Sequence, residues 1–221
     1  MVKTPEQKFW NDPKVVEEFF KAKTSPYWKK FLSSLEKPYH YHILDLGCGG
    51  GRNTEFIAKT GFDTWACDLH SSMVKATRER LRGLISNKDM RKRIVKATML
   101  KLPFRANSFD IIIANGVYHN ADSLKHFTNA VKETSRVLKK DGFLCLNVFY
   151  KGIIASELKK TGPDTNTFIT KEGLCLILLP KRKILSLLKN SRFLPFEKIT
   201  TYNRKVSTGL RSVFRGVFKK F

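Results

Sequence analysis

Acidic residues are scarce in this chain of 221 residues, where 19 Asp and Glu stand against 42 Lys and Arg and leave a net charge of +23. Net charge governs association and solubility, so this imbalance excludes no fold. It does favour polyanionic partners such as RNA or an acidic membrane surface. The excess is concentrated in residues 75–105 and again from Lys181 onward, and each cluster is either a binding face or a solvated face.

Cysteine is also sparse, and its four copies are widely separated. They are Cys48, Cys67, Cys145 and Cys175. No C-x-x-C pair is present, and no neighbouring histidine stands at metal-ligand spacing. The pattern predicts core thiols in a reducing compartment and no metal site.

Long apolar runs are missing as well. A membrane span needs about 20 consecutive apolar residues, and a signal peptide needs an apolar stretch that residues 1–10 lack. We therefore expect a cytoplasmic soluble protein without a membrane span. Pro and Gly are dispersed rather than gathered into a linker, and a chain of this length is typical of one domain with a substantial core.

The sequence does contain a glycine-rich turn between an apolar strand and a helix, spelled Ile43-Leu44-Asp45-Leu46-Gly47-Cys48-Gly49-Gly50-Gly51-Arg52. Glycine lets the backbone approach a ligand closely, and the helix that follows offers unpaired N–H groups. A dinucleotide fingerprint, G-x-G-x-x-G, would need glycine where Arg52 stands. The spacing therefore disfavours a dinucleotide.

The run from Asp45 to Gly51 resembles the first motif of the class I S-adenosylmethionine-dependent methyltransferases. Three more matches follow in order: Asp68 after an apolar stretch, Leu102-Pro103-Phe104 before the apolar run 108–113, and residues 136–142. Arg52-Asn53 and Gly61-Phe62-Asp63 resemble the tellurite-resistance and related small-molecule members. The resemblance covers residues 41–149 and, in outline, the C-terminal part. It implies a Rossmann-like α/β fold with a seven-stranded, mostly parallel sheet in the order 3-2-1-4-5-7-6 and helices on both faces.

Hydrophobic periodicity places the elements of this fold. It predicts strands over 41–46, 63–68, 93–97, 110–115 and 143–149, and helices over 52–59, 72–86 and 123–138. Two short helices are expected in 5–35, a helix over 172–189 interrupted at Pro180, and β-strands over 196–202 and 211–218. Ser71 or Ser72 is the expected cap of the helix over 72–86. We expect a single methyltransferase domain over 1–221, with N-terminal helices or a lid in 1–38, a cofactor-binding core in 39–149, and a C-terminal helix and antiparallel strand pair in 150–221.

The resemblance implies S-adenosyl-L-methionine as cofactor and S-adenosyl-L-homocysteine as product. Asp45 inherits a place near the methionine amino group, with an ordinary turn-capping Asp as the alternative. Gly47, Gly49 and Gly51 inherit close backbone approach to the cofactor, with Cys48 between them. Asp68 is the expected partner of the ribose hydroxyls, with a helix cap as its alternative.

Further cofactor contacts follow from charge and position. Arg52 opposes the helix dipole, which indicates a nearby anion such as the methionine carboxylate, although a solvated arginine is an equal alternative. Leu69 and Met99 are candidates to hold the adenine, or ordinary core residues. Thr98 stands where many relatives have an Asp for the adenine amino group, and Asn115 ends the fourth expected strand beside the cofactor.

Methyl transfer is an in-line displacement that depends mainly on holding donor and acceptor in line. Where the acceptor carries a proton, a base helps, and the candidates are His119 and Tyr118, each with wall packing as the alternative. Trp10, Tyr27 and Trp28 are candidates for a lid over the acceptor or for the core.

Three functions fit the sequence. The first is methyl transfer to a small-molecule acceptor, favoured because no RNA-binding module is recognisable. The second is methyl transfer to RNA (tRNA or rRNA), favoured by the basic charge. The third is a non-catalytic regulatory subunit that binds S-adenosylmethionine. The sequence identifies neither the acceptor atom nor the oligomeric state.

Overall fold

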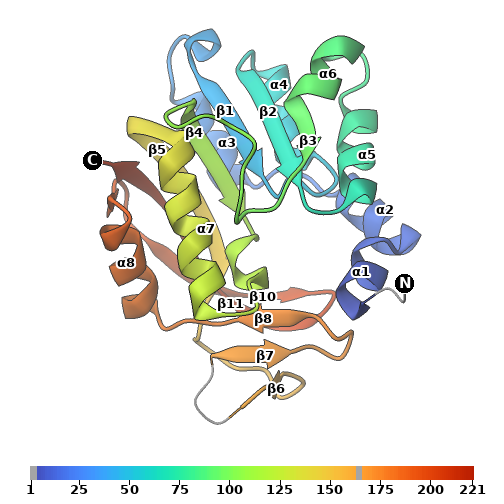
Figure 1. The fold of residues 1–221 in the computed structure, drawn as a ribbon, viewed down its shortest axis with the longest axis vertical. Coiled ribbons are helices and arrows are strands. Elements are labelled where there is room, and N and C mark those ends of the chain that lie inside the picture. Colours follow the sequence, from blue (N-terminus) through green and yellow to red (C-terminus); the bar gives the residue numbers. More distant parts are fainter. Residues whose placement is uncertain (1–3, 163–165) are drawn as a thin grey trace.

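The structure is a computed structural model that describes residues 4–162 and 166–221. Residues 1–3, and residues 163–165 within the loop expected up to Thr167, lie outside the described residues. In the described part, an eight-stranded sheet stands between two layers of helices, and a small three-stranded sheet lies below it (Figure 1).

Five parallel strands form the main part of the large sheet. They are β1 (His42–Leu46), β2 (Asp63–Asp68), β3 (Ile94–Lys96), β4 (Phe109–Asn115) and β5 (Leu138–Phe149). Three antiparallel strands extend it, namely β9 (Phe193–Pro195), β10 (Thr200–Val206) and β11 (Gly209–Lys220). The order β10-β11-β5-β4-β1-β2-β3 confirms the expected class of fold, and the short strand β9 paired to β11 is an addition to the seven expected strands.

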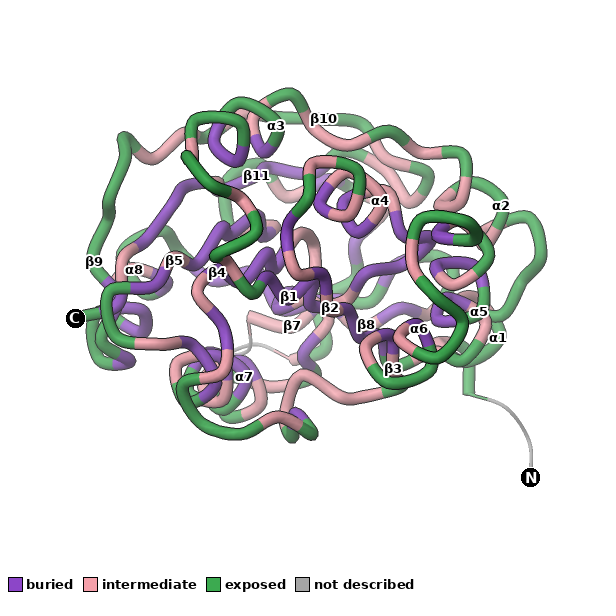
Figure 2. The backbone as a smooth tube through the Cα atoms, turned by 90° about the horizontal axis from the view of Figure 1, so that it is seen from above, coloured by how far each residue is buried: buried purple, intermediate pink, exposed green. Residues whose placement is uncertain are grey.

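Helices cover both faces of this sheet, and its central strands are buried between them (Figure 2). The helices α3 (Pro26–Ser33), α4 (Arg52–Lys59) and α5 (Ser71–Arg80) pack on one face, and α7 (Leu124–Val137) and α8 (Lys181–Asn190) pack on the other. The central strands are apolar on both sides, as buried parallel strands are. In β4, for example, Ile112 packs in the α7 layer while Ile111 and Ile113 pack in the α3 layer.

The N-terminal segment forms three helices where the sequence predicted two. They are α1 (Pro5–Trp10), α2 (Pro13–Lys21) and α3. Each helix starts with a proline, and the residue before that proline caps the helix: its side chain accepts a backbone N–H from the first turn. The capping residues are Thr4, Asp12 and Ser25. Proline at the first helical position loses no hydrogen bond, so a new helix starts at Asp12-Pro13. The spacing of the apolar residues did not reveal this helix start.

The helix predicted over 72–86 ends earlier. α5 ends at Arg80, the chain turns at Gly83 with φ +81°, and a separate helix, α6 (Asn87–Arg93), begins after the predicted segment and is capped by Ser86. The expected cap of α5 is wrong: His70 occupies that position without a side-chain bond, and the Ser72 hydroxyl donates to the Trp10 carbonyl oxygen at 2.9 Å.

The segment expected to be a helix over 172–189 is helical only in its second half, and it contains a short strand before Pro180. Residues Cys175–Ile177 form β8, which pairs with β7 (Thr167–Ile169), and β7 pairs with β6 (Lys159–Lys160) inside the expected loop. The helix α8 starts only after Pro180. The apolar run of 174–179 is buried whichever backbone it adopts, so periodicity alone could not distinguish helix from strand.

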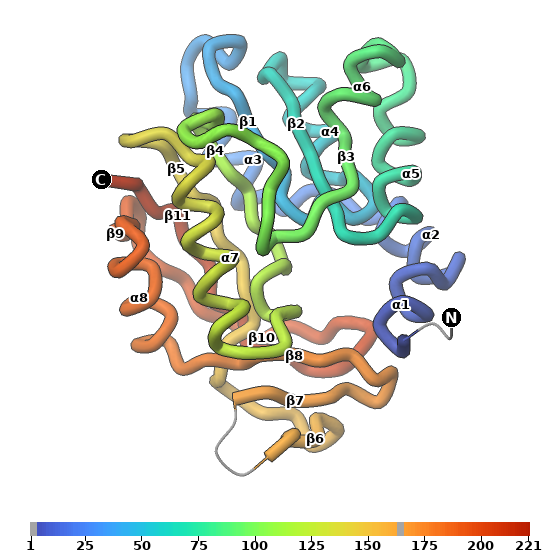
Figure 3. The backbone as a smooth tube through the Cα atoms, in the orientation of Figure 1, coloured from blue at the N-terminus to red at the C-terminus, as the bar shows by residue number. Residues whose placement is uncertain are grey.

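The two C-terminal strands are present with shifted bounds, and two short 3₁₀ turns complete the fold: η1 (Pro38–His40) and η2 (Tyr118–Asn120). Figure 3 shows β8 passing below η2, at the edge where β4 ends. A Cβ on Gly173, in the turn between β7 and β8, would lie 2.7 Å from Pro5 of α1. The small sheet and the first helix therefore meet below the carboxyl ends of the parallel strands.

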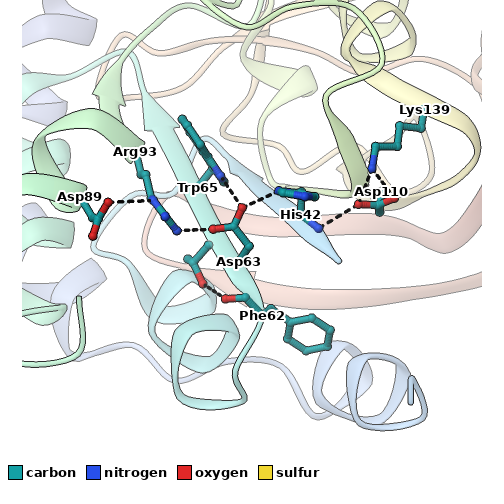
Figure 4. Close-up of polar contacts among 9 residues, drawn as sticks. His42, Phe62, Asp63, Trp65, Asp89, Arg93, Asp110 and Lys139 are labelled. Carbon is teal, nitrogen blue, oxygen red and sulfur yellow. Dashed lines mark hydrogen bonds and ion pairs between the residues drawn. The ribbon is translucent and has the colours of Figure 1, made fainter. Parts of the chain in front are cut away.

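A polar network fixes the opposite edge of the sheet, where β1 and β2 begin (Figure 4). The Asp63 carboxylate accepts from the Trp65 indole at 3.0 Å, lies 2.5 Å from His42 Nδ1 and forms an ion pair with Arg93. The His42 backbone N–H in turn donates to Asp110 at 2.9 Å. These contacts hold the starts of β1, β2 and β4 together, far from the cavity described next.

Candidate active site

A cavity of about 290 Å³ opens at the carboxyl ends of β1, β2 and β4, where α1, α2 and β8 close over it. This is the place where parallel α/β sheets bind ligands. Seven of the residues expected to bind cofactor line it: Gly47, Gly49, Asp68, Leu69, Thr98, Met99 and Asn115. The fold thus brings together residues from four separate parts of the chain.

The glycines of the turn have different tasks. Gly47 and Gly49 line the cavity with φ of +67° and +54°, a conformation that favours glycine. A Cβ on Gly47 would lie 2.4 Å from the Val117 side chain. A Cβ on Gly50 would lie 2.4 Å from the backbone of Phe19 in α2. Gly50 therefore allows α2 to pack closely against the turn. The motif alone did not predict this contact.

Asp68 joins the glycine turn to the start of α5. One carboxylate oxygen accepts the Gly49 N–H and the other accepts the His70 N–H, both at 2.9 Å. Burial raises the pKa of this carboxyl, and the two backbone hydrogen bonds oppose that rise. The carboxylate is thus held by the backbone on the wall of the cavity, and its remaining lone pairs suit hydroxyl donors.

Asp45 lies beneath the cavity rather than in its wall. It is fully buried, and one oxygen accepts the Thr54 hydroxyl hydrogen at 2.6 Å while the other, Oδ1, has no partner among the described residues. Burial raises its pKa to about 6. A buried acceptor without a donor is costly, so this oxygen is suited to a donor delivered by a ligand or a water molecule.

Three more expected cofactor residues, Cys48, Gly51 and Arg52, are absent from the described lining of the cavity. Cys48 is buried beside the Thr77 hydroxyl, 3.3 Å away, and burial raises its thiol pKa well above its usual value. Burial and the nearby Arg204 lower the pKa of Arg52. These three residues therefore support the turn on its side away from the cavity.

The expected catalytic pair also lies outside the cavity lining. The Tyr118 hydroxyl is buried against Thr134 Oγ1 at 2.6 Å. His119 is buried, its ring stacks on Phe149 with centroids 3.9 Å apart, and its Nδ1 accepts the Phe149 backbone N–H at 3.1 Å. Burial lowers the His119 pKa to about 3. Both side chains therefore support the wall, which was the alternative weighed for each.

Of the three aromatic residues expected to form a lid or core, one reaches the cavity. Trp10 lines it, packing edge-on against Phe19 with centroids 5.4 Å apart. Trp28 is fully buried, and Tyr27 packs edge-on against it. The N-terminal helices thus contribute both cover and core.

Sequence reasoning did not assign several residues to the lining of the cavity: Glu6, Asn120, Asp122, His126 and Cys175. His126 Nδ1 lies 2.5 Å from Asp122 Oδ1. The spacing of four residues at a helix start was a usable signal, because such side chains are neighbours on a helix. Glu6 and Cys175 had no signal, since only the tertiary fold brings α1 and β8 to this place.

Comparison with known proteins gives consistent results. Residues 44–146 match the model of a methyltransferase domain family. A probable tRNA methyltransferase 9B from Bos taurus is 31% identical over 128 residues, which are 58% of this chain and 25% of that protein. A ubiquinone/menaquinone biosynthesis C-methyltransferase UbiE from Pseudoalteromonas translucida is 36% identical over 118 residues, which are 50% of this chain and 43% of that protein. The chain therefore spans less than half the length of these relatives.

A solved structure of a S-adenosylmethionine-dependent methyltransferase from Methanosarcina mazei superposes with a TM-score of 0.72 at 19% identity, covering 90% of this chain and 99% of that one. At this identity the superposition establishes the fold. Within residues 4–162 and 166–221, no helix has the length and apolar character that crossing a bilayer requires. The domain match, the shared fold and the glycine turn beside Asp68 agree, and the chain contains a class I S-adenosylmethionine-dependent methyltransferase domain.

Proposed function

We propose that the protein transfers a methyl group from S-adenosylmethionine to a small-molecule acceptor. The observation that carries this proposal is one cavity whose lining joins the glycine turn and Asp68 to Asp122 and His126. Trp10 lies on the side of Asp68, because its ring stacks on that of His70. A donor and an acceptor held together in this cavity would be kept in line, which supplies much of the catalysis that a methyl transfer needs.

The cavity residues around the glycine turn and Asp68 suit the cofactor. The Asp68 carboxylate is positioned for the ribose hydroxyls, and Gly47 and Gly49 leave room for the amino acid portion. Leu69 and Met99 offer apolar surface to the adenine, with Thr98 and Asn115 as polar neighbours in the same wall. The Asp45 oxygen Oδ1, which has no partner among the described residues, would accept a hydrogen bond from the cofactor or from a water molecule.

Charge inside the cavity favours a small acceptor. Its described lining includes the carboxylates of Glu6, Asp68 and Asp122 but no lysine or arginine, although the chain as a whole carries a charge of +23. A further anionic group, carried by the acceptor, would be repelled by these three carboxylates and would meet no lysine or arginine in the described lining, which is costly. We therefore expect the acceptor to be neutral or cationic where it enters the cavity.

The cofactor site is tested by titration calorimetry with S-adenosylhomocysteine. Asp68→Ala should weaken binding by about 10- to 100-fold, the effect of losing charge-assisted hydrogen bonds. The exposed Glu36→Gln removes the same charge and should bind as the wild type does. Equal affinity of Asp68→Ala and wild type contradicts the assignment.

The acceptor class is tested with methyl-labelled S-adenosylmethionine and single compounds from a panel of aromatic amines, phenols and thiols. Each compound is paired with a phosphorylated or carboxylated analogue of similar size. Label should enter the neutral or cationic members and not their anionic analogues. Preference for the anionic analogues contradicts the charge argument, and no label in any compound or in total RNA favours a non-catalytic binding subunit.

A second candidate is methyl transfer to RNA, which a specific surface favours. A shallow recess adjoins the cavity through Leu69, Ala97 and Thr98, and Lys96 and Lys101 line it. Phosphate groups would find cationic partners here, outside the acidic cavity. The resemblance to proteins described as tRNA methyltransferases is in keeping with this candidate.

The double variant Lys96→Ala/Lys101→Ala separates the two candidates. If RNA is the acceptor, the variant should bind total tRNA more weakly and with a shallower dependence on salt, because each lost phosphate contact lowers that slope. Lys132→Ala/Lys189→Ala, on the exposed sides of α7 and α8, is the control with the same loss of charge. Equal salt slopes in both variants would remove the support for RNA.

A further inference from the structure

His126 and Asp122 form a dyad in the lining of the cavity. His126 lies in the first turn of α7, and its backbone N–H donates to the Ser123 hydroxyl at 3.2 Å, which caps the helix. Its ring lies four residues from Asp122, with Nδ1 and Oδ1 2.5 Å apart. The backbone bond and the ring contact together fix where the imidazole stands.

The contact with Asp122 determines which ring nitrogen is available. A carboxylate oxygen accepts hydrogen bonds, so the Nδ1 beside it carries the proton, and in the neutral ring Nε2 then keeps its lone pair. No hydrogen bond to His126 Nε2 is present among the described residues. His126 therefore offers a free proton acceptor, whereas His119 uses its Nδ1 to accept a backbone N–H.

The pair is partly open to solvent, with 40% of the His126 side chain and 63% of the Asp122 side chain exposed. It differs from other helix ion pairs because both residues line the cavity, together with Glu6 from α1 and Cys175 from β8. The negative charges of Asp122 and Glu6 both act on the Cys175 thiol, whose pKa burial and these charges raise. The two carboxylates thus lie on the same side of the cavity and favour positive charge there.

We propose that His126, oriented by Asp122, accepts the proton that the acceptor loses when it is methylated. This inference rests on the proposed function. The attacking atom of the acceptor, a nitrogen, oxygen or sulfur that bears hydrogen, forms a bond to the methyl carbon with its lone pair. The carbon–sulfur bond breaks, and its electron pair stays on sulfur.

The proton of the attacking atom moves to His126 Nε2 and from there to solvent. Asp122 stabilises the imidazolium that this transfer creates, and Glu6 adds negative charge to the same region. His126 is thus the catalytic base, and Asp122 is a positioning residue.

The first test measures methyl transfer to whichever panel compound the wild type methylates best. His126→Ala should lower kcat by about 100-fold or more, as expected for loss of a general base. KM should change little, and free imidazole should restore part of the rate in a saturable way. The exposed His40→Ala is the matched control and should match the wild type. A His126→Ala enzyme within threefold of wild type, or one that imidazole does not rescue, overturns the proposal.

The second test does not depend on turnover. Long-range proton–nitrogen NMR of the histidine rings should report His126 with Nδ1 protonated and Nε2 bare. Asp122→Asn should shift it toward the opposite tautomer, because the amide can donate to Nδ1, while S-adenosylhomocysteine affinity stays within about twofold. A protonated Nε2 in the wild type overturns the proposal. If the wild type methylates no compound, the proposed function fails, and the NMR result still decides whether His126 is oriented as a base.

Discussion

The Trp28 indole N–H donates to the side-chain oxygen of Asn115 at 3.1 Å. Trp28 belongs to α3 and is fully buried, whereas Asn115 ends β4 and lines the cavity. This hydrogen bond links the N-terminal helices to the cavity wall. The segment before the first strand therefore takes part in forming the site.

Trp28→Phe tests that link. The change leaves the Asn115 oxygen without its donor and removes part of a buried ring, so the free energy of unfolding should fall by about 2–4 kcal/mol. Urea unfolding measures this loss, and calorimetry should show weaker S-adenosylhomocysteine binding. Tyr39→Phe, at an exposed position, is the control. Unchanged cofactor affinity would show that Asn115 keeps its place without Trp28.

Asp45 should make the protein less stable as pH rises. Burial raises its pKa from 3.8 to about 6, so the folded state holds a proton that the unfolded state has released between these values. Stability contributed by this group falls as pH rises from about 4 to 6, by up to about 3 kcal/mol. Asp45→Asn should lack this loss in urea unfolding across the range, while Glu36→Gln should follow the wild type. Parallel curves for Asp45→Asn and wild type would contradict the prediction.

His119 should have the opposite dependence. Burial lowers its pKa from 6.5 to about 3, so between these pH values the unfolded state is protonated at His119 and the folded state is not. The contribution is fully present above pH 6.5 and is lost as pH falls toward 3, by at most about 5 kcal/mol. His119→Gln should lose less stability than wild type between pH 6.5 and 4, measured against the exposed control His40→Gln. An identical loss in both variants would show that His119 is protonated in the folded state.

The network around Asp63 should matter for stability and not for the cofactor. Its carboxylate contacts His42, Trp65 and Arg93 at the edge opposite the cavity (Figure 4). Asp63→Ala leaves the His42 ring and the Trp65 indole without this acceptor and leaves Arg93 with Asp89 alone, so thermal unfolding should show a loss of about 1–3 kcal/mol. S-adenosylhomocysteine affinity below the melting range should be unchanged. Weaker binding would show that the two edges of the sheet are coupled.

The sequence predicted the α/β core closely because its signals are local. Apolar strands such as 110–115 and the glycine turn at 47–51 carry their conformations in neighbouring residues, and the strand order followed from the resemblance that those residues support. Predictions failed where local signals were balanced. The apolar run of 174–179 was predicted as helix, and pairing with β7 made part of it a strand.

The site divides in the same way. Gly47, Gly49 and Asp68 could be named from spacing, because the turn and the strand that follows it place them beside each other. His119 was one of two candidate bases, with wall packing as the alternative, and the fold buries it against Phe149. His126 lies in the cavity because α7 begins beside the carboxyl end of β4.

The amino-acid sequence by itself determined the glycine turn and the place of Asp68 beside it, because glycine turns, strand ends and helix starts are set by residues adjacent in the chain. Only the tertiary structure decided which residues complete the lining of the cavity. There, Glu6 and Cys175 come from segments distant in sequence from Asp122 and His126. Packing of α1 and β8 across the ends of the strands brings them together, and no local pattern encodes that contact.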